Sequence, residues 1–204
     1  MTRVRMVRPE DFSPELKQLV GAETLSSFEL GVIRGYANCP EIAAGFAQLA
    51  ASLVAGRHLP ARLVELVRLR IAFSNQCRSC MAVRYPDALD DGLSEGQVCS
   101  LERPSEANDL TDAEKAAIKY GDLMATDHLA IDDALYDELR RHFTEYEIVE
   151  LGMVCAVFVG FGRLAATWAM VEELPDRFQG EGTKTPWGGD VIVKRRYATA
   201  ETLG

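Results

Sequence analysis

The chain has 204 residues, of which 48% are apolar and 26% charged, and its net charge is −9 at neutral pH. This is the composition of an ordinary globular protein with a core large enough to fold without disulfide staples. The acidic balance argues against nucleic acid as a partner, because binding it needs a basic surface.

The longest apolar run covers residues 151–162, which is 12 residues. A bilayer span needs about 20 residues, so this run predicts a buried core helix and no membrane partner. The first residues are too polar for a secretory signal, and the five cysteines are an odd number. We therefore expect a reducing cytoplasm, where a C-x-x-C pair is more often redox-active or metal-binding than structural.

The first half of the chain predicts helices separated by proline and glycine. Proline is favoured in the first helical turn and glycine just past the last, and apolar residues between them recur at helical spacing. A further helix should begin near Cys77 and run toward Asp90, with Pro86 able to kink or end it. The segments expected to be helical before it are a short helix from Pro14, then residues 27–37, 40–56 and 60–73.

Capping boxes mark the helix starts of the second half. A Ser or Thr followed three residues later by Gln or Glu recurs at Ser94, Thr111 and Thr144, and such a pair satisfies free N–H groups. No segment alternates with period two until residues 191–197, so the fold class is all-α. The helices expected here cover residues 98–102, 111–126, 132–143 and 144–173.

Residues 174–204 are rich in glycine and proline and predict an extended C-terminal tail after a single helical domain over residues 1–173. Trp187 and the apolar residues that follow it suggest that the tail docks on another surface, such as a neighbouring subunit, and the alternative is a loosely ordered terminus. The remaining cysteines, Cys39, Cys99 and Cys155, have apolar helical contexts and are expected to be packed thiols.

Cys77 and Cys80 form a C-x-x-C pair, and Arg84 follows. On one helix, offsets of three and seven place the three side chains within about 60° of one another. A helix start favours a thiolate, and a second thiol can close a disulfide with the first. Half of a zinc site and two inert buried thiols are the alternatives. Zinc usually takes four ligands, and the three histidines are scattered.

Glu65 is the acidic residue of the predicted helix 60–73, and its neighbours are apolar. A lone carboxylate in such a place is either paired with an arginine or kept for proton transfer. Arg62, Arg68 and Arg70 are available as structural partners, so the sequence leaves both interpretations open.

The order Glu65, then Cys77 twelve residues later, then Cys80 resembles the carboxymuconolactone decarboxylase family, and in particular its alkyl hydroperoxidase D (AhpD) branch. The resemblance covers residues 40–172 and includes "LPARLVELVRLRIAFSNQCRSC" and "LTDAEKAAIKYGDLM". It implies an AhpD-like helical bundle that forms homo-oligomers, commonly trimers or hexamers. We expect no cofactor and no metal.

Carried over by position, the resemblance implies that Cys80 reacts with peroxide, that Cys77 resolves the product and that Glu65 belongs to a proton relay. The histidine of the family would fall at Arg84, and Ser79 replaces the His or Tyr common inside the pair. Arginine cannot relay a proton as histidine does. It could instead lower a thiol pKa, pair with Glu65 or bind a substrate carboxylate.

The leading hypothesis is a thiol-dependent peroxidase or disulfide oxidoreductase with peroxiredoxin-type, antioxidant activity. Its substrate would be a small hydroperoxide or disulfide, and an external dithiol would reduce the enzyme. One alternative is a lyase that acts on a small carboxylated lactone, like the decarboxylases that name the family. Another is a non-catalytic oligomeric redox sensor, which the substitution at Arg84 favours.

Overall fold

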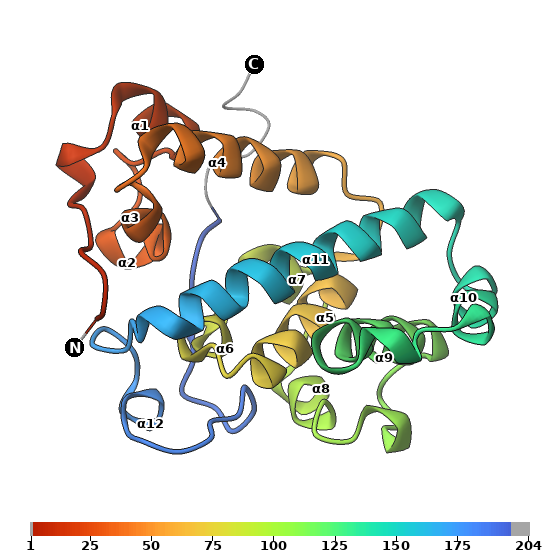
Figure 1. Ribbon diagram of the computed structural model, residues 1–204. Helices are drawn as coiled ribbons and strands as arrows, with labels where there is room; N and C mark the ends of the chain where they lie inside the picture. Colours follow the sequence, from red (N-terminus) through yellow and green to blue (C-terminus); the bar gives the residue numbers. More distant parts are fainter. Residues whose placement is uncertain (1, 197–204) are drawn as a thin grey trace. The chain divides into compact units, whose positions relative to one another are not determined.

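A computed structural model describes residues 2–196 of the chain, and its secondary structure is almost entirely helical (Figure 1). The all-α prediction is confirmed. The described residues group into two compact units, one of residues 58–193 and one of residues 2–57 with 194–196. The single domain over residues 1–173 stays a prediction, and the last part of the expected tail, residues 197–204, lies outside the described residues.

The unit of residues 2–57 is a cluster of short helices under one longer helix. Its core is apolar and includes Leu16, Leu30 and Ile33, each fully buried. The expected helix over residues 27–37 is divided in two because Gly31 has a φ of 43°, which ends the first part. The helices are η1 (Pro9–Asp11), α1 (Pro14–Val20), α2 (Ser27–Leu30), α3 (Ile33–Tyr36) and α4 (Pro40–Ala55).

The unit of residues 58–193 is built around α5 (Ala61–Ser74), which packs against α9 (Asp112–Thr126) and α11 (Glu145–Trp168). Ten of the 14 residues of α5 are buried, so this helix forms the centre of the core. The further helices are α6 (Arg78–Ala82), α7 (Pro86–Asp90), α8 (Glu95–Ser100), η2 (Pro104–Glu106), η3 (His128–Ala130), α10 (Asp133–Arg140) and α12 (Asp176–Gln179).

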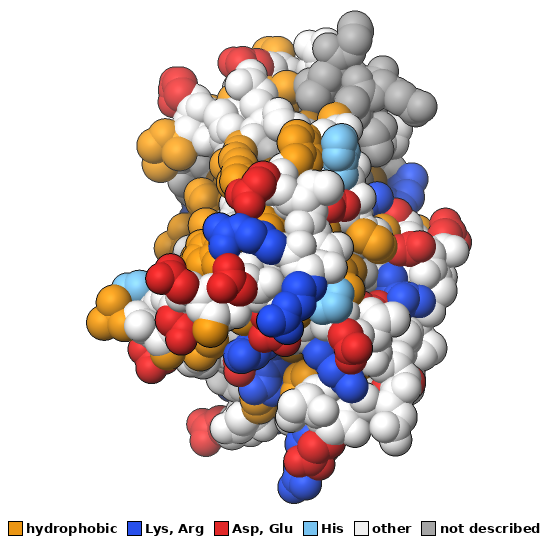
Figure 2. Space-filling view, turned by 90° about the vertical axis from the view of Figure 1, so that its right-hand side faces the viewer, with side chains coloured by type: hydrophobic (Ala, Val, Ile, Leu, Met, Phe, Trp, Pro, Cys, Tyr) orange, Lys and Arg blue, Asp and Glu red, His pale blue; other side chains and the backbone are white. Residues whose placement is uncertain are grey.

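All three predicted capping boxes are present, at Ser94, Thr111 and Thr144. In each box, the Ser or Thr hydroxyl accepts a hydrogen bond from the backbone N–H three residues later. The Gln or Glu side chain at that later position accepts one from the backbone N–H of the Ser or Thr. On the face shown in Figure 2, acidic and basic side chains are interspersed.

Within residues 2–196, α11 is the one helix long and apolar enough to cross a membrane by length and composition, a test that a core helix also passes. Its buried residues include Glu150, whose carboxylate accepts from the backbone N–H groups of His58 and Leu59 just before α5. These contacts pack one face of α11 against the bundle. The expected buried core helix over residues 151–162 is wrong in part, because only 33% of the apolar window of α11 is buried.

The helix expected from Cys77 toward Asp90 is wrong. Helix α6 ends at Ala82, and Val83–Arg84 form the short strand β1, which pairs in parallel with β2 (Ile192–Val193). A new helix, α7, then starts at Pro86. Two effects explain the break: the residue before a proline avoids the helical conformation, and the tail supplies a strand partner for β1.

Candidate functional site

The cysteine pair lies in the turn that follows α5. Gln76, directly before the pair, has a φ of 50°, an uncommon left-handed conformation for a residue with a side chain. Asn75 fixes the same turn to α11, because its amide donates to the carbonyl of Phe158 and its oxygen accepts from Arg163. The dithiol is therefore presented by a constrained turn at the end of the central helix.

Cys77 and Cys80 are joined in a disulfide, with their Cα atoms 5.2 Å apart. The two residues differ in exposure: Cys77 is fully buried, whereas Cys80 is partly exposed. Ser79 lies between them, and its Oγ is 3.6 Å from the sulfur of Cys77. Cys80 is thus the more exposed residue of the pair.

Glu65 is fully buried in α5 and forms an ion pair with Arg68 one turn later. Both carboxylate oxygens accept from the guanidinium, from Nε and Nη2, at 2.7 Å each. Burial disfavours the Arg68 cation, but the charge and hydrogen bonds of Glu65 outweigh burial and raise the pKa of Arg68. Of the two interpretations of Glu65 that the sequence left open, pairing with an arginine is the one observed.

Arg68 also connects this ion pair to the cysteine helix. Its Nη1 donates to the carbonyl of Cys80 at 2.6 Å, and its Nη2 donates to the carbonyl of Val83 at 2.8 Å. The guanidinium lies over the ring of Tyr85, 5.1 Å from its centre. Sequence reasoning considered Arg68 only as a partner of Glu65. Its spacing of three residues from Glu65 predicts the pair, but its contact with Cys80 depends on the turn between the helices.

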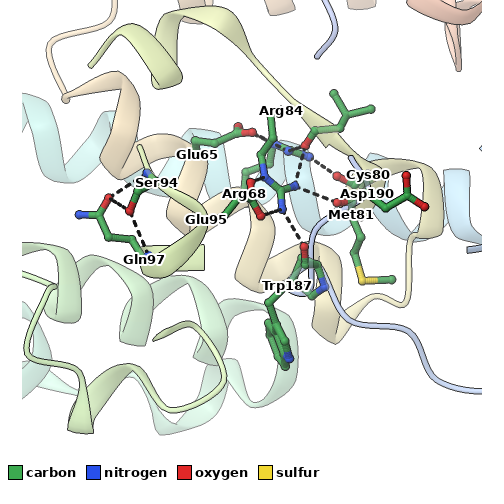
Figure 3. Close-up of polar contacts among 12 residues, drawn as sticks. Glu65, Arg68, Cys80, Met81, Arg84, Ser94, Glu95, Gln97, Trp187 and Asp190 are labelled. Atoms are coloured by element: carbon green, nitrogen blue, oxygen red, sulfur yellow. Dashed lines mark hydrogen bonds and ion pairs between the residues drawn. The ribbon is translucent and has the colours of Figure 1, made fainter. Parts of the chain in front are cut away.

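Arg84 is almost completely buried, at 1% exposure, and lies in β1, just after the end of α6. All five of its N–H donors are used within the chain (Figure 3). Nε and Nη2 bind the two carboxylate oxygens of Glu95, and Nη1 and Nη2 bind the carbonyls of Met81, Val83 and Pro186. No donor of Arg84 is left for a substrate carboxylate.

The expected common face of Cys77, Cys80 and Arg84 does not form, because Arg84 belongs to β1 and not to the cysteine helix. Figure 3 shows Arg84 between the Ser94–Gln97 capping box of α8 and Trp187 of the C-terminal segment. Arg84 thus holds two distant segments at the end of α6. The sequence did not reveal this structural role, because the acceptor in the C-terminal segment, Pro186, is 102 residues away.

Residues 174–193, which we call the C-terminal strap, pack within the same unit as the dithiol. Figure 1 shows the strap, in blue, passing beside α6. Phe178 of α12 is buried at 1% exposure, and β2 at the end of the strap pairs with β1. The described part of the tail therefore docks on its own chain.

The strap forms hydrogen bonds with the residues on both sides of Cys77. The side-chain amide of Gln76 exchanges two hydrogen bonds with the backbone of Lys184, at 2.9 and 3.2 Å. Arg78 donates to the carbonyls of Phe178 and Gln179. Strap and dithiol turn are consequently one packed structure.

The histidines and the other three cysteines lie outside the ion pair of Glu65 and Arg68. No histidine within residues 2–196 forms a hydrogen bond or ion pair with Glu65 or Arg68, and the ring of His58 stacks on Tyr146. Of the other cysteines, Cys155 is buried, and burial raises the pKa of its thiol to about 12. The expectation of packed thiols is wrong for the two that are exposed, Cys39 and Cys99.

In the described part of the chain, no three His, Cys, Asp or Glu side chains are grouped so that they could hold a metal ion. The bonded pair of Cys77 and Cys80 brings thiol and disulfide chemistry to the site. A dithiol that closes a disulfide gives up two electrons to an acceptor and can be restored by another dithiol.

A protein-family model described as the carboxymuconolactone decarboxylase family matches residues 40–122. An uncharacterized protein of Mycobacterium tuberculosis is 42% identical over 89 residues, which is 43% of this chain and 31% of that protein. The chain thus spans less than a third of the length of this relative. Over residues 40–122 the match agrees with the family resemblance expected from the sequence.

Two solved structures have a similar fold. The debrominase Bmp8 aligns with a TM-score of 0.66 and 20% identity over 82% of this chain and 90% of that chain. An uncharacterized peroxidase-related protein with an alkylhydroperoxidase AhpD core, from Ralstonia eutropha, aligns with a TM-score of 0.65 and 16% identity. The alignment covers 87% of this chain and 94% of that chain. At these identities the similarity shows an AhpD-like fold.

Proposed function

Because residues 40–122 of this chain belong to the carboxymuconolactone decarboxylase family, we propose that it is a thiol-dependent peroxidase or disulfide oxidoreductase that works through Cys77 and Cys80. The observation that carries the proposal is the bonded cysteine pair with its unequal exposure. A partly exposed Cys80 suits the attacking sulfur, and a buried Cys77 suits the resolving one.

The proposed cycle has three balanced steps. The Cys80 thiolate attacks one oxygen of a hydroperoxide, the O–O bond breaks, and an alcohol leaves after it takes up a proton. Cys77 then attacks the sulfenic acid sulfur, the S–O bond breaks, and water leaves as the disulfide forms. Finally, an external dithiol reduces the disulfide and is itself oxidised. A reducing cytoplasm, the location we predict, would supply such a dithiol.

Proton transfer in this cycle departs from the pattern that the resemblance implies. Both oxygens of Glu65 are bound by Arg68, and the donors of Arg84 are committed to Glu95 and to carbonyls. We therefore propose that the leaving oxygen takes its proton from solvent at the exposed side of Cys80. A general base or acid must be within hydrogen-bond reach of the proton it moves.

Peroxide consumption with a dithiol reductant tests this proposal. We expect Cys80→Ser to lose turnover, and Cys77→Ser to turn over more slowly, because its sulfenic acid cannot be resolved within the chain and must react directly with the external dithiol. Cys99→Ser is the matched control, since Cys99 is an exposed cysteine outside the pair. If Cys80→Ser consumes peroxide as fast as the parent protein, the proposal fails.

A redox sensor without turnover is the second candidate, and the committed contacts of Glu65 and Arg84 favour it. It predicts that the pair is oxidised once by peroxide and is then reduced slowly by dithiols. Counting turnovers in the same assay separates the candidates: many turnovers per chain support the peroxidase, and one supports the sensor. The lyase alternative needs a group that binds the substrate carboxylate, and Arg84 has no donor left for it.

We also propose a homo-oligomer, a trimer or hexamer as the resemblance implies. Four large apolar side chains of α11 support this: Tyr146, Val149, Met153 and Leu164 are at least 40% exposed. Exposed apolar side chains along one helix are typical of a surface that another chain covers. Light scattering of the full chain gives the oligomer size, and a monomer at micromolar concentration would contradict the proposal.

A further inference from the structure

We propose that Arg68 is a positioning residue that stabilises the Cys80 thiolate, an inference that rests on the proposed dithiol function. Neither the sequence pattern nor the comparisons assign this role. It follows from the position of one guanidinium, which is 4% exposed and contacts both Glu65 and the backbone of Cys80.

The guanidinium of Arg68 lies between the Glu65 carboxylate and the backbone carbonyls of Cys80 and Val83. Its Nε and one N–H of Nη2 face the Glu65 carboxylate, while Nη1 and the other N–H of Nη2 face the carbonyls of Cys80 and Val83. The ion pair is therefore a dipole whose positive end contacts the backbone carbonyl of Cys80. A buried positive charge close to a thiol favours its deprotonated form.

A count of donors distinguishes Arg68 from Arg84. A guanidinium has five N–H groups, and four of those on Arg68 are used in the described part of the chain. The remaining N–H belongs to Nη1, which is the nitrogen bonded to the carbonyl of Cys80. Arg68 therefore keeps one donor beside Cys80, whereas Arg84 keeps none.

Other groups near Cys77 and Cys80 are less able to stabilise the Cys80 thiolate. Helix α6 has five residues, too few for a substantial helix dipole. Arg78 is bound to two carbonyls of the strap. The further groups whose charge acts on Arg68 are Tyr85 and Asp87, and like Glu65 they counteract its positive charge when they are ionised.

The test measures the pKa of Cys80 from the pH dependence of alkylation by iodoacetamide. The full-length background is Cys39→Ser, Cys77→Ser and Cys99→Ser, which leaves Cys80 and the buried Cys155. Opposite charges beside a thiol shift its pKa by about 1–3 units, and Glu65 offsets part of this. We expect Arg68→Gln to raise the pKa of Cys80 by about one unit, which is a tenfold loss of thiolate at neutral pH.

Two further arginine variants show whether the effect is specific. Arg68→Lys keeps the charge but cannot bridge a carboxylate and two carbonyls, so it should restore most of the thiolate while the protein stays less stable. The matched control is Arg70→Gln. Arg70 lies on the same helix and forms a similar double hydrogen bond, to Asp122. It should leave the pKa of Cys80 unchanged.

Glu65→Gln keeps the test decisive if Arg68→Gln does not fold. It removes the negative end of the dipole and keeps Arg68, so it should lower the pKa of Cys80. A higher pKa in Glu65→Gln, or an unchanged pKa in a folded Arg68→Gln, overturns the inference. Alkylation needs no peroxide, so a failed peroxidase assay beside the expected pKa shifts would reject the proposed function and keep the role of Arg68.

Discussion

Replacing Arg84 with Met removes the guanidinium that joins α6, α8 and the strap, and we expect it to lower the free energy of unfolding by about 2 kcal/mol. The carbonyls of Met81 and Pro186 lose the donor from Arg84, whereas the carbonyl of Val83 keeps Arg68. An unsatisfied buried acceptor costs about 1–3 kcal/mol, so two give about 2–6 kcal/mol. Relief of guanidinium desolvation brings the estimate to the low end.

The loss of the ion pair with Glu95 adds little to this value. The side chain of Glu95 is 42% exposed, so water can solvate its carboxylate once the arginine is gone. Exposed ion pairs contribute only about 0–1 kcal/mol. The predicted effect therefore comes from the backbone carbonyls that Arg84 satisfies and not from the charge it neutralises.

Urea unfolding followed by circular dichroism measures the change, with Arg140→Met as the matched control. Arg140 is 51% exposed and pairs with Asp137 and Glu145 on the surface, so its loss should cost less than about 0.5 kcal/mol. In a Trp168→Phe background, the fluorescence of Trp187 reports whether the strap detaches. If Arg84→Met is no less stable than Arg140→Met, the assignment of Arg84 as the residue that holds the strap is refuted.

Three further predictions concern other parts of the chain. Gly121→Ala should destabilise the protein by about 1–3 kcal/mol in the same unfolding assay, because an added Cβ would lie 2.7 Å from Val67 in the α5–α9 contact. Arg195 lowers the pKa of Glu29 from 4.5 to about 2, so this pair stabilises the fold above pH 4.5. The stability difference between the parent and Arg195→Gln should therefore shrink as the pH falls from 4.5 toward 2; a constant difference would contradict it. Cys155, with a pKa of about 12, should resist iodoacetamide at pH 8 in the folded protein and react once it is unfolded.

The helices and their starts could be predicted because the signals for them are local. Each capping box is formed by two side chains three residues apart, and both residues can be recognised in the sequence. The pair of Glu65 and Arg68 is local in the same sense, which is why pairing was among the alternatives. Such features depend little on the rest of the fold.

The site around the cysteines was harder to predict because its contacts are distant in sequence. Strand β1 exists because residues 192–193 lie beside it, and the acceptors of Arg84 include Pro186, 102 residues away. The periodicity around Cys77 carries no information about either contact. The pair of Cys77 and Cys80 and the nearby Glu65 could therefore be identified from the sequence. The end of the cysteine helix before Arg84 could not.

The two buried arginines together determine how this site can respond to pH. A histidine at the position of Arg84 would change its charge between about pH 5 and 8, and a relay built on it would give activity that rises and then falls with pH. Arginine side chains stay charged over this range, and those of Arg68 and Arg84 are fixed by ion pairs with Glu65 and Glu95. With the charges of both arginines fixed, the pH dependence of reactivity is set by the ionisation of the thiols of Cys77 and Cys80. Reactivity toward peroxide should therefore rise with pH along a single limb that follows the ionisation of Cys80.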